Sequence, residues 1–364
     1  MRQGRGRKRS NDALRMEDVA AHAGVSPMTV SRALRDPAAV SQAMRDRVQA
    51  AVQDTGYVPN GLAGSLSSQR SRVVGLIVPG ISNSLYAHMA QAIADVLSQH
   101  GLHLLIASSG HDSAAEEAAI AAFLGQRVCA LILHSTRHTA RATALVKAAG
   151  IPTVEIGQLT RTPLDLCVSY SGFKAAKAMV MHLGALGYRR IGFVTLPVRG
   201  NERSVERRRG YRAGLKALGM PEDPANITEA EPGFAGGVSA VVQLIERAPA
   251  IDAIFFAADV MAVGALFECQ RRGWAVPDRL AIASFDDVDL LSHVAPTITT
   301  LRIPREEIGR RSASMLVARL NGTLSGPAVV DLKFDIAQRE STTRITGKLC
   351  TQANSVPEGR SRRK

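Results

Sequence analysis

Apolar residues near the start of the chain recur at helical spacing. The repeat falls on Met16, Val19, Ala20 and Ala23. Residues three and four positions apart share one side of a helix, so the repeat predicts a buried helix face. Gly24 interrupts it, and Ser26 followed by Pro27 is typical of the N-terminus of a second helix. The pattern therefore predicts two short helices joined by a tight turn.

The second predicted helix has an apolar face and a polar face. Its inward positions are Val30, Ala33 and Leu34, and its outward positions are Met28, Thr29, Ser31 and Arg32. Such a helix pair is either an ordinary αα-hairpin or a DNA-binding helix-turn-helix. In the second case the start of the second helix lies against base edges in the major groove. The local pattern leaves both interpretations open.

A third helix is expected between Ser41, a good N-cap, and Gly56, which ends it. We therefore expect residues 15–60 to form a small helical headpiece, preceded by a basic tail at 1–14. Its predicted core consists of small residues: Val19, Ala20, Val25, Val30, Leu34, Val48 and Val52. So small a core is only marginally stable by itself.

Residues 61–72 form the predicted linker, and Asn60 is placed to cap a short helix there. Gly61 and Gly64 oppose this helix, because each costs about 1 kcal/mol relative to alanine. We expect the segment to be coil in free protein and helix on DNA.

From Val73 onward, apolar strands alternate with amphipathic helices. The expected strands are Val73–Pro79, His103–Ala107, Ala130–His134, Thr153–Ile156, Ile191–Leu196, Ala253–Ala257 and Ala281–Phe285. The expected helices include Ser84–Gln99, Ala114–Leu124, Phe173–Leu186, Val205–Leu218 and Met261–Arg272. This alternation predicts an α/β fold with parallel strands covered on both faces. One sheet of that many strands is possible from the alternation alone.

The positive charge lies at the two ends of the chain. The formal net charge is +13 over 364 residues. Residues 1–72 hold 12 Lys and Arg against 6 Asp and Glu, and residues 344–364 hold 6 against 1, which leaves +2 for the 271 residues between. A basic end beside a helix-turn-helix suits contacts with DNA phosphates. The C-terminal charge is better explained as a solvated tail.

The cysteines and the N-terminus favour a cytoplasmic protein. Cys129, Cys167 and Cys269 lie in apolar runs without paired spacing, which is typical of core thiols in a reducing compartment. The N-terminal RQGRGRKRSND lacks the apolar segment of a signal peptide, and no apolar run reaches membrane-spanning length.

Catalytic signatures are absent from the sequence. No GxGxxG follows a strand, and GxxxxGK[ST], HExxH, CxxC and GxSxG do not occur. Scattered histidines such as His134 are more typical of hydrogen-bonded structural residues. We therefore expect no enzymatic activity, no cofactor and no metal, although a sugar-acid enzyme of α/β type remains a competing interpretation.

Polar residues instead gather after the carboxyl ends of strands, where open α/β sheets bind ligands. These candidates for ligand binding are Asn83, Tyr86, Arg203, Arg207, Asp259 and Asp286. Carboxylates accept hydrogen bonds from sugar hydroxyls, and Arg binds an acid group with two parallel bonds. For Asp259 an N-cap role is at least as good an explanation. In the run Arg207–Arg209, Arg208 and Arg209 are interpreted as only a solvated face.

The run AxxAGVSxxTVSRxL, followed by GYxPN, resembles the headpiece of the LacI family of bacterial transcription regulators, and the resemblance extends to about residue 345. It implies a two-lobed effector domain at 73–345, like that of periplasmic sugar-binding proteins. The implied N-lobe is 73–167 with 300–328, and the C-lobe is 168–299 with 329–345. A final strand is expected at Asp331–Gln338, and 346–364 remains as a basic tail.

The resemblance also assigns the DNA contacts. It favours the helix-turn-helix over the αα-hairpin, with Met28 beside Pro27 at the main base-reading position. Met28 offers an apolar contact but no donor pair, so side-chain chemistry makes Arg32 the better candidate for guanine and places Ser26 and Thr29 on phosphates. The full candidate set is Ser26, Pro27, Met28, Thr29, Ser31, Arg32, Asn60 and Leu66. Leu66 matches the family leucine that wedges between base pairs in the minor groove. Gly64 departs from the bulkier residue usual in the hinge.

Within the effector domain, Arg207 matches the family's ligand-binding arginine and Phe234 matches an aromatic residue that packs on the ligand. Ala258 stands where many members have Asn, and Ser171 where Asp is common. Several stretches resemble the gluconate-operon repressor branch: SPMTVSRALRDP, TRHT and AVGALFECQRRGWAVPDRLAIASF. That branch implies a sugar acid such as gluconate, with Arg203 and Arg207 on its carboxylate.

The resulting interpretation is a repressor of a sugar or sugar-acid operon that binds operator DNA as a homodimer, with a tetramer left open. An effector would release the repressor, or, as in some family members, act as a corepressor. A binding protein for sugar transport shares the two-lobed fold, but the headpiece and the lack of a secretion signal argue against it.

Overall fold

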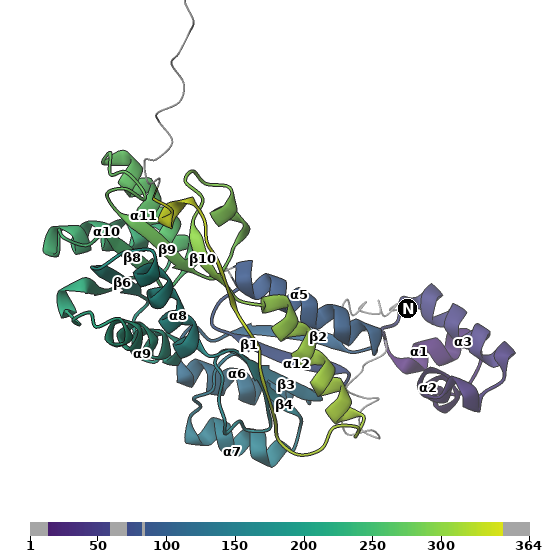
Figure 1. Ribbon diagram of the computed structural model, residues 1–364. Coiled ribbons are helices and arrows are strands. Elements are labelled where there is room, and N and C mark those ends of the chain that lie inside the picture. The colour runs from purple at the N-terminus through teal and green to yellow at the C-terminus, as the bar shows by residue number, and fades with distance from the viewer. Residues whose placement is uncertain (1–13, 59–70, 82–83, 345–364) are drawn as a thin grey trace, which may run out of the picture. The chain divides into compact units, whose positions relative to one another are not determined.

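The computed structural model describes residues 14–58, 71–81 and 84–344 (Figure 1). Their contacts group them into a small N-terminal helical unit and a larger α/β unit, and we describe each by itself. Over the described ranges, no helix combines the length and the apolar character needed to cross a membrane.

The helical unit contains α1 (Met16–Ala23), α2 (Pro27–Arg35), η1 (Pro37–Ala39) and α3 (Gln42–Thr55). Gly24 ends α1 with φ of 58°, a left-handed conformation that a residue without Cβ adopts at low cost. Ser26 then caps α2, since its Oγ accepts a hydrogen bond from the Thr29 N–H at 3.2 Å. Ser41 caps α3 in the same way, and Gly56 ends it. These helix limits agree with those predicted.

The turn between α1 and α2 is held by a residue from α3. The Arg47 guanidinium donates to the carbonyl oxygens of Ala23 at 2.6 Å and of Gly24 at 3.0 Å. The core beneath is made of small residues together with one large one, Tyr57: Val19, Ala20, Ala23, Val30, Ala33, Val48 and Ala51. Val25, Leu34 and Val52, which were predicted as core, are partly buried at its edge. Tyr57 was not predicted.

The α/β unit contains two six-stranded sheets, one in each lobe. In the N-lobe sheet the order is β11 (Ala328–Asp331), β5 (Leu166–Ser169), β4 (Thr153–Glu155), β3 (Ala130–Leu133), β1 (Val73–Val78) and β2 (His103–Ser108). In the C-lobe sheet it is β12 (Asp335–Ala337), β10 (Thr299–Arg302), β9 (Ala281–Phe285), β8 (Ala253–Phe256), β6 (Ile191–Thr195) and β7 (Ile227–Glu229). Two sheets, rather than one large sheet, confirm the two-lobed α/β fold.

Described strand pairs are parallel except for β10 and β12. The central strands are buried along their whole length, as expected for parallel sheets covered on both faces. Cys129, Cys167 and Cys269 are buried and form no disulfide among the described residues, in agreement with the prediction of core thiols.

Helices cover both sheets (Figure 1). The N-lobe has α5 (Ser84–Gln99), α6 (Ser113–Gly125), α7 (Ala140–Ala149) and α12 (Arg305–Leu320), and the C-lobe has α8 (Gly172–Ala185), α9 (Glu202–Ala217), α10 (Phe234–Arg247) and α11 (Asp259–Arg271). Short 3₁₀ turns are η2 (Pro224–Asn226), η3 (Asp289–Ser292) and η4 (Glu340–Thr342). Helices α5 and α12 pack together, as do α8 with α9 and α10 with α11.

The chain passes between the lobes three times, a few residues later than predicted at each crossing. Strand β5, Leu166–Ser169, still belongs to the N-lobe, so the first crossing follows it. Thr299–Arg302 lies in the C-lobe sheet and Ala328–Asp331 in the N-lobe sheet, which corrects the predicted limits of 300 and 328. Each crossing lies later in the sequence than predicted, because the chain completes a strand before it leaves the sheet. The final strand is correspondingly short, Asp335–Ala337 instead of Asp331–Gln338.

Candidate functional site

Helix α2 presents the residues expected to contact DNA. The Met28 side chain is 70% exposed and Arg32 is exposed, whereas Thr29 and Ser31 are half-buried. Pro27 occupies the first helical position, and the Ser26 and Thr29 hydroxyls lie 2.9 Å apart. An exposed helix start with polar and apolar groups is the geometry that base reading requires. Asn60 and Leu66 lie outside the described residues, so their assignments stay predictions.

The candidate effector residues come from elements that end or begin at the space between the lobes. Tyr86 lies on α5 after β1, Arg203 and Arg207 on α9 after β6, and Asp259 at the start of α11 after β8. Asp286 follows β9 directly. The chain order of strand, loop and helix thus brings these side chains to the carboxyl ends of both sheets. Asn83 lies outside the described residues.

Arg207 is buried and held on several sides. Its Nη1 donates to the Ala257 carbonyl at 2.6 Å and its Nη2 to the Tyr170 hydroxyl at 3.1 Å. The guanidinium carbon lies 3.6 Å from the centroid of the Phe285 ring, an arrangement that stabilises a cation. Nε is buried and has no hydrogen-bond partner among the described residues.

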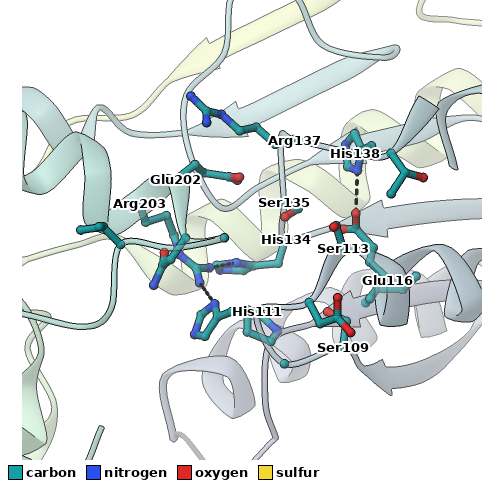
Figure 2. A pocket seen from close by; sticks show the side chains of 18 residues that line it. Ser109, His111, Ser113, Glu116, His134, Ser135, Arg137, His138, Glu202 and Arg203 are labelled. Atoms are coloured by element: carbon teal, nitrogen blue, oxygen red, sulfur yellow. Dashed lines mark hydrogen bonds and ion pairs between the residues drawn. The ribbon is translucent and has the colours of Figure 1, made fainter. Parts of the chain in front are cut away.

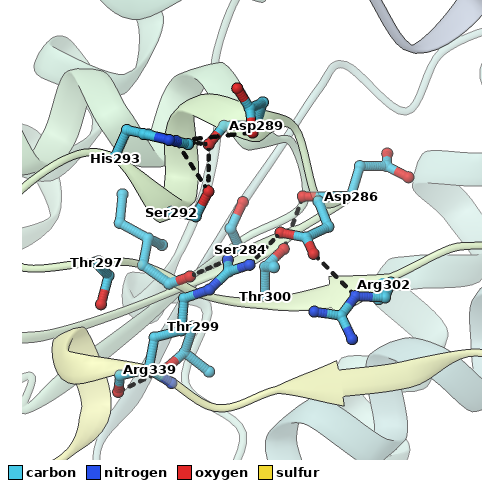
Figure 3. A network of polar contacts seen from close by, with 12 residues as sticks. Ser284, Asp286, Asp289, Ser292, His293, Thr297, Thr299, Thr300, Arg302 and Arg339 are labelled. Carbon is cyan, nitrogen blue, oxygen red and sulfur yellow. Dashed lines mark hydrogen bonds and ion pairs between the residues drawn. The ribbon is translucent and has the colours of Figure 1, made fainter. Parts of the chain in front are cut away.

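Asp286 adopts a left-handed backbone conformation with φ of 71°, which is costly for a residue with a side chain. The Thr300 hydroxyl donates to its carbonyl at 2.7 Å (Figure 3). The Asp286 carboxylate is buried, and its Oδ2 lies 3.8 Å from Nη2 of Arg207. A second arginine, Arg305, approaches the other oxygen: its Nε donates to Oδ1 at 3.0 Å.

Asp259 is the first residue of α11, and the N-cap is Ala258, so the suggested N-cap role for Asp259 is wrong. Its Oδ1 accepts a hydrogen bond from the Val260 N–H at 2.6 Å, and its buried Oδ2 has no partner within the described ranges. Burial, together with the negative charge of Asp286, raises the pKa of Asp259 to about 6. Ser171, at the position where Asp is common in the family, caps α8 through the Lys174 N–H.

A cavity of about 280 Å³ opens between the lobes, and of the candidate effector residues its lining includes Arg203 but not Arg207, Asp259 or Asp286 (Figure 2). Its wall from the N-lobe follows β2 and β3 and includes Ser109, His111, Ser113, Glu116, His134, Ser135, Arg137 and His138. Its wall from the C-lobe includes Asn201, Glu202 and Arg203 at the start of α9. The sequence pointed to Arg203 but not to the N-lobe residues, although they too follow the carboxyl ends of strands.

Arg203 reaches from the C-lobe to two histidines of the N-lobe. Its guanidinium contacts Nδ1 of His134 and lies 3.2 Å from Nδ1 of His111 (Figure 2). Burial and the charge of Arg203 lower the pKa of His111 to about 4 and that of His134 well below its ordinary value. Both imidazoles are therefore neutral at pH 7 and accept hydrogen bonds from Arg203. The Tyr86 ring meets the His134 ring edge to face, with centroids 4.9 Å apart.

A second lobe contact lies next to Arg203. The Thr136 N–H of the loop after β3 donates to Oε1 of Glu202 at 2.8 Å. The two lobes are thus joined at the cavity by hydrogen bonds from adjacent residues of α9.

The far end of the cavity holds a buried charged triad. His138 lies between two carboxylates, with Nδ1 2.8 Å from Glu116 and Nε2 3.2 Å from Glu155. Burial alone lowers the pKa of His138, but hydrogen bonds and Coulomb attraction from Glu116 and Glu155 outweigh it and raise the pKa to about 9. His138 is therefore a cation at pH 7.

We expect this triad to make the stability of the effector domain depend on pH. The folded-state pKa is above that of the unfolded chain, so the stabilisation is complete below pH 6.5 and is lost as the pH rises towards 9. The free energy of unfolding should fall by about 3 kcal/mol over that interval. Denaturant unfolding between pH 6 and pH 9.5 measures the effect. His138→Gln should remove most of the slope, whereas His103→Gln, at an exposed position, should keep it.

Phe234 lies apart from this group in the contacts described. Its ring is 47% exposed and stacks on Phe267 at a centroid distance of 6.3 Å. Its packing on a ligand stays a prediction. Within the part of the chain that the structure describes, no cluster of three His, Cys, Asp or Glu residues is suited to hold a metal ion.

Comparisons with known proteins cover both units. Residues 15–60 match the family described as bacterial regulatory proteins, lacI family, and residues 180–342 match the periplasmic binding protein-like domain. The HTH-type transcriptional regulator GntR of Escherichia coli K12 is 34% identical over 322 residues, which are 88% of this chain and 96% of that protein.

Solved structures of similar proteins support the same family. A LacI-family transcriptional regulator from Silicibacter pomeroyi superposes with a TM-score of 0.84 at 31% identity, covering 91% of this chain and all of that one. The lac repressor dimer bound to operator shares the fold at a TM-score of 0.78 and 23% identity, covering 92% of this chain and 100% of that one. These relatives are transcription regulators and not enzymes. The chain belongs to the LacI family of bacterial transcriptional regulators and is a DNA-binding member of it.

Proposed function

We propose that this protein represses an operon for the use of a sugar acid and leaves its operator when that acid, an aldonate such as gluconate, binds between the lobes. Two headpieces of a homodimer would occupy two half-sites of a near-palindromic operator. The lac repressor of the same fold is a dimer on its operator, which supports this assembly. The GntR relative supports the gluconate branch.

The proposal of an acidic effector rests on one observation, the groups that surround the Arg203 guanidinium. Its described partners are two imidazoles that are neutral at pH 7. The three carboxylates of the cavity lining accept hydrogen bonds from other groups: Glu116 from His138, Glu202 from Thr136 and Asp112 from the Ala114 N–H. A guanidinium that faces neutral groups in a largely buried space favours an anionic ligand, because charge-assisted bonds to a carboxylate are about twice as strong as neutral ones.

Buried polar atoms without partners extend this site. Nε of Arg207 and Nε2 of His134 are unpaired, and so is Oδ2 of Asp259, among the described residues. Buried polar groups are nearly always hydrogen-bonded in native structures, so such atoms indicate a missing ligand or water. An aldonate offers acceptors through its carboxylate and both donors and acceptors through its hydroxyls. It therefore complements the two kinds of unpaired atom.

Ligand binding would act by shifting the equilibrium between lobe arrangements. Arg203 and Glu202 both bridge the lobes, and an acid that binds Arg203 competes with His134 and His111 for its donors. A change in occupancy from 1:99 to 99:1 requires about 5.5 kcal/mol of differential binding, which two clefts of a dimer would share.

The test is selection of DNA fragments by the full-length protein at fixed salt, with and without gluconate, followed by anisotropy titrations on the selected duplex. We expect one near-palindromic sequence to be enriched and gluconate, but not glucose, to weaken its binding. Tighter binding with gluconate would indicate a corepressor instead. Lack of preference for any duplex over random competitor would contradict the proposed function.

A further inference from the structure

The carboxylate of Asp286, which a neutral sugar would need as a hydrogen-bond acceptor, is already bonded to arginine side chains of the protein. Asp286 is the buried acceptor of the candidate site, yet its Oδ1 accepts from both Nε and Nη2 of Arg305. Its Oδ2 faces Arg207. Each oxygen of the carboxylate is therefore next to a guanidinium. Arg305 was not among the residues to which the sequence pointed.

Arg305 reaches Asp286 from the other lobe. It is the first residue of α12, which packs on α5 and β5 in the N-lobe, whereas Asp286 follows β9 in the C-lobe. The Arg305 guanidinium also lies 5.7 Å from the centroid of the Tyr170 ring. Asp286 and Arg305 are 5% and 11% exposed. Water screens such a pair weakly, so its effect on a neighbouring ligand is large.

A neighbouring ion pair provides a contrast. Asp287, next in sequence, pairs with Arg302 at 3.0 Å, and the Arg302 side chain is 55% exposed. Arg339 also pairs with Asp287, at 2.8 Å. Figure 3 shows Arg302 and Arg339 at this turn. Asp286 and Asp287 thus both have arginine partners. Of the described pairs, Arg302 and Arg339 contact Asp287, whereas Arg305 contacts Asp286.

The charges of the site now favour an acid over a neutral sugar. Two guanidinium groups, those of Arg207 and Arg305, lie next to the Asp286 carboxylate, and Arg203, on the same helix as Arg207, faces two histidines. The histidines near Arg203 contribute no charge at pH 7. An uncharged polyol finds Asp286 already hydrogen-bonded, whereas an acid can pair with the Arg203 guanidinium, whose described partners are neutral.

We propose that Arg305 is a specificity-determining residue, which excludes neutral sugars by capping Asp286 and favours sugar acids by its charge. This inference rests on the proposed function, because it assumes that the effector binds in the space between the lobes. It assigns the choice between acid and neutral ligand to a cross-lobe ion pair.

The experiment compares wild type, Arg305→Met, Arg305→Lys and Arg302→Met as full-length proteins. Isothermal calorimetry at pH 7.5 measures binding of gluconate, glucose and sorbitol to each. Met keeps the length of the stem without charge or donors, and Lys keeps the charge. Arg302→Met removes an arginine from the adjacent aspartate and is the matched control. Thermal unfolding of each variant establishes that it is folded.

In Arg305→Met we expect gluconate to bind about tenfold more weakly and glucose or sorbitol about tenfold more tightly, so that the acid preference falls about a hundredfold. Arg305→Lys and Arg302→Met should keep most of the preference. An unchanged preference in a folded Arg305→Met, or an equal loss in Arg302→Met, would overturn the inference. Failure of wild type to bind gluconate would contradict the proposed effector, whereas a gain of neutral-sugar binding in Arg305→Met would still support the capping role.

Discussion

Replacing Arg207 by alanine is expected to give a repressor that binds its operator normally and ignores its effector. The guanidinium lies beside Asp286 and over the Phe285 ring, and its buried Nε has no hydrogen-bond partner in the described part of the chain. Loss of a buried charged partner of this kind typically weakens ligand binding by 2 kcal/mol or more, about thirtyfold at least. Anisotropy on operator DNA, titrated with gluconate, measures the response.

The same substitution should lower the stability of the effector domain. The Ala257 carbonyl and the Tyr170 hydroxyl each lose a hydrogen bond, and of the two described arginine partners of Asp286 only Arg305 remains. We expect a loss of about 3 kcal/mol in the free energy of unfolding. Arg209→Ala is the control, because Arg209 lies on the same helix in an exposed pair with Glu206. A normal gluconate response in Arg207→Ala would move the effector site elsewhere.

Arg32→Ala should have the second largest effect, this time on DNA. The side chain is exposed on α2, within the segment that a helix-turn-helix presents to the major groove. An arginine that pairs with guanine contributes about 1–3 kcal/mol of discrimination, so specific binding should weaken roughly tenfold to a hundredfold while nonspecific binding changes little. Competition between operator and random duplex at constant salt gives both constants.

Arg35→Ala provides the comparison for Arg32. Arg35 is the last residue of α2 and its Nε donates to the Ser31 carbonyl at 3.3 Å, away from the start of the helix. We expect its loss to weaken operator and random duplex by similar factors, as removal of a phosphate contact does. Equal losses on the two duplexes for Arg32→Ala would argue against base reading by that residue.

Much of the fold is visible in the sequence because buried parallel strands are continuous apolar runs. Strands such as Ile191–Thr195 and Ala281–Phe285 stand out for this reason. Helix α12 was missed because its sequence, REEIGRRSASMLVARL, is rich in arginine and buries a narrow stripe that includes Ile308, Ala313 and Leu316. Helix α10 was missed because it begins FAGG, a weak helix-forming sequence whose glycines allow close packing instead.

The candidate site was predictable only where residues follow strand ends in order. Arg203 and Asp286 share that position in the chain. The partners that define their chemistry come from elsewhere: His134 and Arg203 are 69 residues apart, and Arg305 and Asp286 belong to different lobes. The charge of His138 likewise depends on two glutamates that come together only in the folded domain. Pattern and spacing contain no information on such pairs.

The return of the chain to its first lobe has a consequence for synthesis on the ribosome. Helix α5 buries Met89, Ile93 and Leu97, and it packs against α12, which lies about 200 residues further along. At roughly 5–20 residues per second, α12 follows α5 only after about 10–40 s of translation. During that interval α5 is part of a growing polypeptide in which α12 has not yet been synthesised. We therefore expect assistance by chaperones to matter more at this nascent stage than for the completed chain.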